Sequence, residues 1–194
     1  MSRPSRLASD PLPALAQRLR GLARTVRALV LLAAPILALL PVGLLVDPAT
    51  VLQMGLGEPS GLSMSHLAQG GMTLAVRMRL AAVVLLPAGL GLALLWQLWV
   101  LFGEYLRGEV FSARALACLR RFGALLLVLA FAQPLAQALM TVALSWDNPP
   151  GQRVLNIAVS SNDYALVLGA LVFVAIARVM TEAARVAEEN EGFV

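Results

Sequence analysis

Few side chains in this sequence could do chemistry, and the ones that share a helix face are glutamines. Gln133 and Gln137 stand four residues apart in an uncharged stretch, so a helix places them on one face. Gln97 lies in another uncharged stretch, and we expect it to reach toward them. Amides in hydrocarbon either hydrogen-bond across helices or line a polar path. No Asp, Glu, Lys or Arg stands mid-stretch, which favours hydrogen bonding and argues against an ion or proton pump.

A charged stripe near the C-terminus is the second candidate. The stripe and its acidic continuation consist of Arg178, Glu182, Arg185, Glu188, Glu189, Asn190 and Glu191. The first three and Glu189 recur at helical spacing, so they share one face. The neighbours Arg178 and Glu182 either anchor the end of a membrane span or contact a partner. An acidic helix face can dock a basic partner through complementary charge, so we predict a partner-binding tail, with plain solvation as the alternative.

Catalytic and metal-binding patterns are missing from the sequence. Cys118 and His66 are each the only residue of their type, which excludes an intrachain disulfide and a Cys/His zinc site within one copy. There is no H-E-x-x-H, no Gly-rich phosphate loop and no grouped triad. We therefore expect neither an enzyme nor a cofactor. The net charge of +4 comes from 15 arginines beside apolar stretches, without a base-reading motif, so we expect no direct binding of nucleic acid.

Long apolar stretches must position these residues. The chain is 59% hydrophobic and only 13% charged, against about 25% charged in soluble domains. A membrane helix needs about 20 apolar residues, and the predicted spans are 28–46, 80–103, 122–146 and 161–180. The last has a short uncharged core, so Arg178 must extend toward the interface. The predicted fold is an all-α membrane protein with four transmembrane helices, the last one extending into the cytoplasm.

Local signals refine the helices. Ser112 is a suitable N-cap for the third span, and Ser160 with Asp163 has the spacing of a capping box for the fourth. Ala165 and Gly169 form a small-xxx-small pair, which predicts a close-packing seam.

Arginine counts predict the orientation. The segments 1–27, 104–121 and 178–194 hold 12 arginines, whereas the other two loops hold 3, namely Arg77, Arg79 and Arg153. Cytoplasmic loops carry the excess of arginine. We therefore predict a multi-pass protein of the inner membrane with both termini in the cytoplasm.

The same counts divide the chain. Residues 1–27 form a basic cytoplasmic segment, whose part from Leu15 onward is amphipathic and suits an interfacial helix. Residues 28–194 form the four-span membrane domain, with a cytoplasmic tail over 181–194.

Two stretches carry a family resemblance. They are GEVFS at 108–112, ahead of the third span, and SSNDY at 160–164, which opens a helix running through RVMTEAAR at 178–185 to the tail EENEGFV at 188–194. With the four-span layout, residues 80–194 resemble the bacterial DUF2975 family of integral membrane proteins. The family has no established activity. Its genes often stand beside a very short helix-turn-helix regulator, which implies a small cytoplasmic DNA-binding partner.

The expected function follows from the tail and the resemblance together. It is a membrane anchor or sensor, embedded in the lipid bilayer, that binds a small cytoplasmic helix-turn-helix regulator. The alternative is a subunit of a small-solute transporter or export system built around Gln97, Gln133 and Gln137. Either function is compatible with a homo-oligomer.

Overall fold

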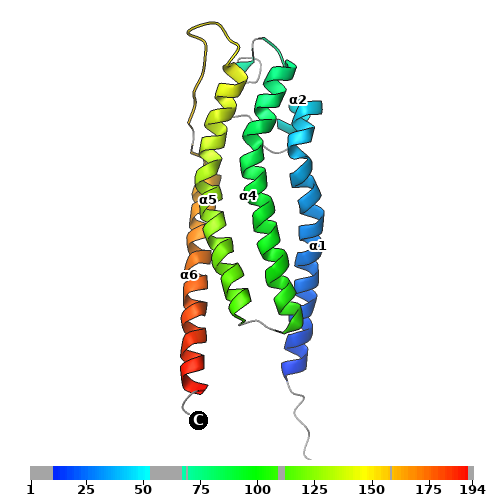
Figure 1. Cartoon of the computed structure of the whole chain (residues 1–194), viewed down its shortest axis with the longest axis vertical. Coiled ribbons are helices and arrows are strands. Elements are labelled where there is room, and N and C mark those ends of the chain that lie inside the picture. Colours follow the sequence, from blue (N-terminus) through cyan, green and yellow to red (C-terminus); the bar gives the residue numbers. More distant parts are fainter. Residues whose placement is uncertain (1–10, 53–66, 69, 109–111, 158, 192–194) are drawn as a thin grey trace, which may run out of the picture.

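Helices make up almost all of the computed structural model (Figure 1). The structure describes residues 11–52, 67–68, 70–108, 112–157 and 159–191. The helices are α1 (Pro11–Val46), the short α2 (Pro48–Val51), α4 (Leu74–Arg107), α5 (Ala113–Ser145) and α6 (Ser161–Glu191). The ranges just given contain no strand. Four of the helices are long and apolar enough to cross a membrane, which confirms the predicted all-α, four-span fold class.

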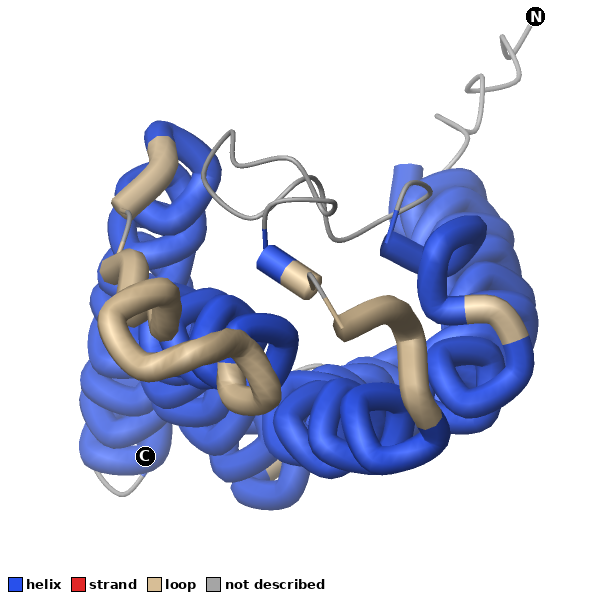
Figure 2. The backbone as a smooth tube through the Cα atoms, turned by 90° about the horizontal axis from the view of Figure 1, so that it is seen from above, coloured by secondary structure: helices blue, strands red, loops and turns tan. Residues whose placement is uncertain are grey.

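The four long helices form one curved layer. α1 packs on α4, α4 on α5 and α5 on α6, and the view along the helix axes shows an open arc with α1 and α6 at its edges (Figure 2). The spanning windows of α1 and α6 are each only 11% buried, against 28% for α4 and 39% for α5. The apolar surface left on the edge helices suits contact with lipid tails, which do not drive helices together by hydrophobicity.

α1 begins earlier than the apolar stretch it contains. It is one continuous helix from Pro11, so the basic residues before the predicted first span continue that span rather than forming a separate element. Pro11 and Pro13 stand in its first turn, where a proline costs no hydrogen bond because the first amides have no helical acceptor. The helix therefore carries arginines past the apolar region.

The larger core lies where α1 and α5 end and α4 begins. Leu44, Leu80 and Leu144 are buried there, one from each helix, together with Leu67 from the connecting segment. Asn148, just after α5, donates from Nδ2 to the Leu67 carbonyl at 3.1 Å. The core and this bond hold the connecting segments on the helix ends.

The two arginines that depart from the predicted charge bias have structural roles at this end. Arg77 Nη1 donates to the carbonyls of Leu45 at 3.1 Å and Val46 at 2.9 Å, the last carbonyls of α1. A cation there also interacts favourably with the negative end of the helix dipole. Arg79 makes two parallel bonds to Asp147, each 3.0 Å long, which join α4 to the end of α5.

The two predicted helix starts are confirmed. Ser112 Oγ accepts from the amide of Ala115 at 3.1 Å at the start of α5. At the start of α6, Ser160 Oγ accepts from the Asp163 amide at 3.2 Å, while Asp163 Oδ2 accepts from the Ser160 amide at 2.8 Å. The reciprocal pair is a capping box.

The predicted seam at Ala165 and Gly169 is wrong. A Cβ added at Gly169 would meet nothing within 4 Å, and Ala165 is exposed. The close contact lies at Gly123 of α5, where an added Cβ would stand 3.1 Å from the backbone nitrogen of Val174. The alanines of α6 that are fully buried are Ala170 and Ala177, seven residues apart. Small residues do form the seam, but on another face of α6.

α6 is shifted along α5 toward one end of the layer (Figure 1). Ala177 packs with Cys118 and Leu119, so a rise of about 1.5 Å per residue puts the first residue of α6 about 15 Å short of the end of α5. At the other end, Glu191 reaches about 12 Å past Ala113, the first residue of α5. The last two turns of α6 therefore project beyond their neighbour.

Candidate functional site

The glutamines are separated along the layer. Gln97 lies 10 residues before the end of α4, whereas Gln133 lies 20 residues after the start of α5. Since the two helices are antiparallel and joined by a short connector, Gln133 and Gln137 lie about 15 and 21 Å farther from that connector than Gln97 does. All three side chains are half-buried. The structure places Gln133 and Gln137 one turn apart but does not bring Gln97 to them, and a role in a polar site stays a prediction.

The charged stripe lies on the part of α6 that projects. Arg185 bonds to Glu182 through Nε, at 3.2 Å to each carboxylate oxygen, and to Glu189 through Nη1 at 2.8 Å. The three side chains are about 60% exposed. The backbone of Glu188, Asn190 and Glu191 continues the same helix. The face is therefore a charged helix surface that no other described element covers.

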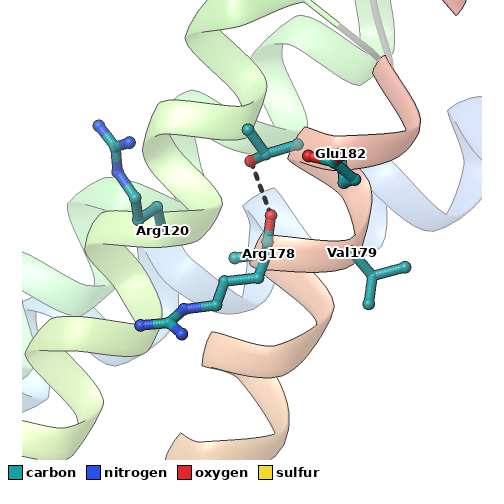
Figure 3. A pocket seen from close by; sticks show the side chains of 6 residues that line it. Arg120, Arg178, Val179 and Glu182 are labelled. Atoms are coloured by element: carbon teal, nitrogen blue, oxygen red, sulfur yellow. Dashed lines mark hydrogen bonds between the residues drawn. The ribbon is translucent and has the colours of Figure 1, made fainter. Parts of the chain in front are cut away.

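Arg178 does not pair with Glu182, because Glu182 is held by Arg185. Arg178 instead extends from α6 toward α5, where Arg120 lies (Figure 3). The two arginines, with Ala177, Thr181 and Glu182, line an open cavity of about 580 Å³ between the helices. The hydrogen bond drawn there runs from Thr181 Oγ1 to the Ala177 carbonyl, at 2.8 Å. The cavity thus presents two cations at the base of the projecting helix.

A second cavity, of about 370 Å³, lies at the same end between α1, α4 and α5. Its lining includes a carboxylate that the structure buries, Glu104, which is 4% exposed. Glu104 Oε1 lies 3.3 Å from Arg107 Nη1 and 3.6 Å from Arg114 Nε. From α1, Arg27 places its guanidinium carbon 3.7 Å above the ring of Trp99. The cavity therefore gathers three arginines, one carboxylate and two tryptophans, Trp96 being the other.

The connector geometry brings these groups together. Gly108 follows α4 with φ 84°, a left-handed conformation that glycine adopts without strain, and its amide donates to the carbonyls of Glu104 and Tyr105. Ser112 then caps α5. The chain turns back within a few residues, so Arg114 faces Glu104 across the turn. Residues 109–111 lie outside the described residues.

The sequence did not single out Arg27, Glu104, Arg107 and Arg114 as a site. Trp96 and Trp99 did signal an aromatic belt at a membrane interface, and that signal marks the correct depth. Pairing Arg27 with Trp99 requires contact between α1 and α4, which spacing along the chain does not give. In the described part of the chain, no group of three or more His, Cys, Asp or Glu side chains could hold a metal ion.

Four long apolar helices, with arginine-lined cavities at one end of the layer, define a multi-pass integral membrane protein. The class is set by the helices, because the cavities contain no recognisable catalytic arrangement. The chain belongs to the family described as "Protein of unknown function (DUF2975)", whose model matches residues 65–193. The match confirms the resemblance seen in the sequence and covers about two thirds of the chain.

The other two comparisons return nothing. Neither the curated proteins nor the solved structures contain a significant match to this chain. The function must therefore be argued from the geometry.

Proposed function

We propose that this protein is an anchor in the bacterial inner membrane that binds a small basic cytoplasmic regulator through the end of α6. The observation that carries the proposal is the projection of α6 as an unbroken helix to Glu191, about 12 Å past the start of α5. A helix end that merely closed the membrane domain would not need two further turns. The protein would act by binding rather than by catalysis.

The charge of the projecting segment indicates the partner. Beyond Thr181 the chain has four glutamates, at 182, 188, 189 and 191, and one arginine, at 185, which gives a net charge of −3. The whole chain is at +4, so the tail is an acidic surface on a basic protein. Complementary charge steers association and suppresses wrong partners. A small DNA-binding regulator is basic where it contacts phosphates, so it suits this surface.

The orientation supports a cytoplasmic partner. The N-terminal part of α1, the α4–α5 connector and the end of α6 lie at one end of the layer (Figure 1). These segments hold the 12 arginines that the positive-inside rule assigns to the cytoplasm. Both termini would then face the compartment where a regulator of transcription works.

The test is an affinity pull-down in mild detergent followed by mass spectrometry. It compares the intact chain, a chain lacking 181–194 and the variant Glu188→Gln/Glu189→Gln/Glu191→Gln, which keeps the helix but removes its excess acid. The control is Arg20→Gln/Arg24→Gln, which changes exposed charges on α1 at the same end. We expect the intact chain and the control to recover a small basic protein, in a complex that added salt weakens. Recovery that is independent of the tail, or equal loss in the control, would contradict the proposal.

A further inference from the structure

The cavity at Glu104 has more positive charge than it can neutralise. Arg27, Arg107 and Arg114 line it with one carboxylate, which leaves a net charge of +2. We propose that this cavity binds a phosphate group, and that its surroundings favour the phosphate of an anionic lipid headgroup over a soluble phosphate compound. The site is separate from the end of α6, so the inference does not depend on the proposed function.

Arg27 is the cation that most needs a ligand. Its Nε is buried and has no hydrogen-bond partner, and no described carboxylate lies within ion-pair distance of its guanidinium. The guanidinium is stacked on Trp99, which fixes its plane and leaves its in-plane donors available. Guanidinium donors match the oxygens of a phosphate in pairs, and such charge-assisted bonds are about twice as strong as neutral ones.

Glu104 acts as a positioning residue. Arg107 and Arg114 both lie nearest to the same oxygen, Oε1, one on each side of the connector. Each arginine has five N–H donors, and the two side chains are 67% exposed. The carboxylate thus holds two guanidinium groups on one side of the cavity while most of their donors stay free. A partner for Arg27 must come from outside the described chain.

The depth of the cavity favours a lipid. Trp96 and Trp99 mark the level at which tryptophans meet lipid headgroups. Exposed Leu85 and Trp96 are 59% and 64% exposed, and their spacing to each other and to Gly103 in the cavity is 11 and 7 residues, so the three share a face of α4. An apolar strip thus runs up α4 from the cavity, as acyl chains require. Basic pockets between helices on the cytoplasmic side bind anionic headgroups.

The experiment measures binding of a fluorescent phosphatidylglycerol to the intact chain in an uncharged detergent. We expect saturable binding, weaker for phosphatidylcholine, whose choline neutralises its own phosphate. Arg27→Gln and Arg107→Gln should each weaken binding about tenfold, since each removes a charge-assisted bond. Arg24→Gln, an exposed change three residues from Arg27 and outside the cavity, should change binding by less than about twofold, because exposed charges are screened.

Each outcome has a meaning. Failure of glycerol 1-phosphate to displace the lipid assigns the phosphate to a headgroup, and displacement at similar concentration assigns it to a soluble compound; both support a phosphate site. Equal binding of the two lipids with no effect of Arg27→Gln would overturn it. So would equal weakening by Arg24→Gln, which would reduce the effect to diffuse surface charge. If Arg27→Gln does not fold, Arg107→Gln decides, because that side chain is exposed.

Discussion

The contact at Gly123 predicts how α6 is held on the layer. A Cβ at this position would lie 3.0 Å from Cγ2 of Val174, 3.1 Å from its backbone nitrogen and 3.3 Å from the backbone carbon of Phe173. Two of these atoms belong to the backbone of α6, so they cannot rotate away. Gly123→Leu should therefore push α6 off α5. Gly169→Leu is the matched control, because the same change there points into open space.

The size of the effect follows from two terms. Both substitutions gain helix propensity, about 0.8–1.0 kcal/mol for replacing a glycine. Only Gly123→Leu has the packing penalty, about 1–3 kcal/mol for inserting atoms into a filled contact. Because the propensity gain is common to both variants, their difference isolates the packing term. We expect Gly123→Leu to be less stable than Gly169→Leu by about 1–3 kcal/mol.

The assay is reversible unfolding of the purified chain in mixed micelles with increasing dodecyl sulfate, followed by circular dichroism. The intact chain gives the reference free energy of unfolding. Equal free energies for the two leucine variants would refute the close contact between α5 and α6. A lower value for Gly169→Leu would restore the seam that the sequence predicted at Ala165 and Gly169.

Three further predictions concern the opposite end of the layer. A double-mutant cycle with Arg79→Ala and Asp147→Ala should give a coupling of about 0.2–1 kcal/mol, as for a half-exposed ion pair, and zero coupling would contradict the paired bonds. Asn148→Ala removes the amide that holds the connecting segment, so it should cost about 1–3 kcal/mol and raise hydrogen exchange there; unchanged exchange would contradict the bond. Bonds from the hydroxyl and amide of Thr50 lower the pKa of Asp47 below its ordinary 3.8. Its contribution to stability is present above that value and lost as the pH falls through the folded pKa, so thermal unfolding should separate intact chain and Asp47→Asn at neutral pH but not in strong acid, and a constant difference would refute this.

Depth along the membrane was predictable from the sequence. The cost of burying charge in hydrocarbon sets where an apolar stretch begins and ends, so all four spans were found. The caps at Ser112 and Ser160 were also predictable, because each involves donors within three residues of the cap.

Lateral packing was not predictable from the same signal. In water an apolar face points to the core, but a membrane helix is apolar all round, so hydrophobicity does not say which face meets a neighbour. Ala165 and Gly169 therefore matched the spacing of a seam on a face that is open. The candidate phosphate site escaped for a related reason: Arg27 and Glu104 are 77 residues apart, and only the packing of α1 on α4 joins them.

The reach of the α6 tail depends on contacts far from the tail itself. Ala177 against Leu119, with Gly123 against Val174, sets the position of α6 along α5. From the other end, the segment that leads into α6 is bonded along α5: the Asn156 amide donates to the hydroxyl of Thr141 at 3.1 Å. A slip of one turn would move the tail by about 5.4 Å, close to half of its projection, and would have to break both sets of contacts. The small residues of the seam and the polar bonds of the preceding segment thus fix together how far the acidic helix extends, and a variant such as Gly123→Leu should alter partner binding without touching the tail.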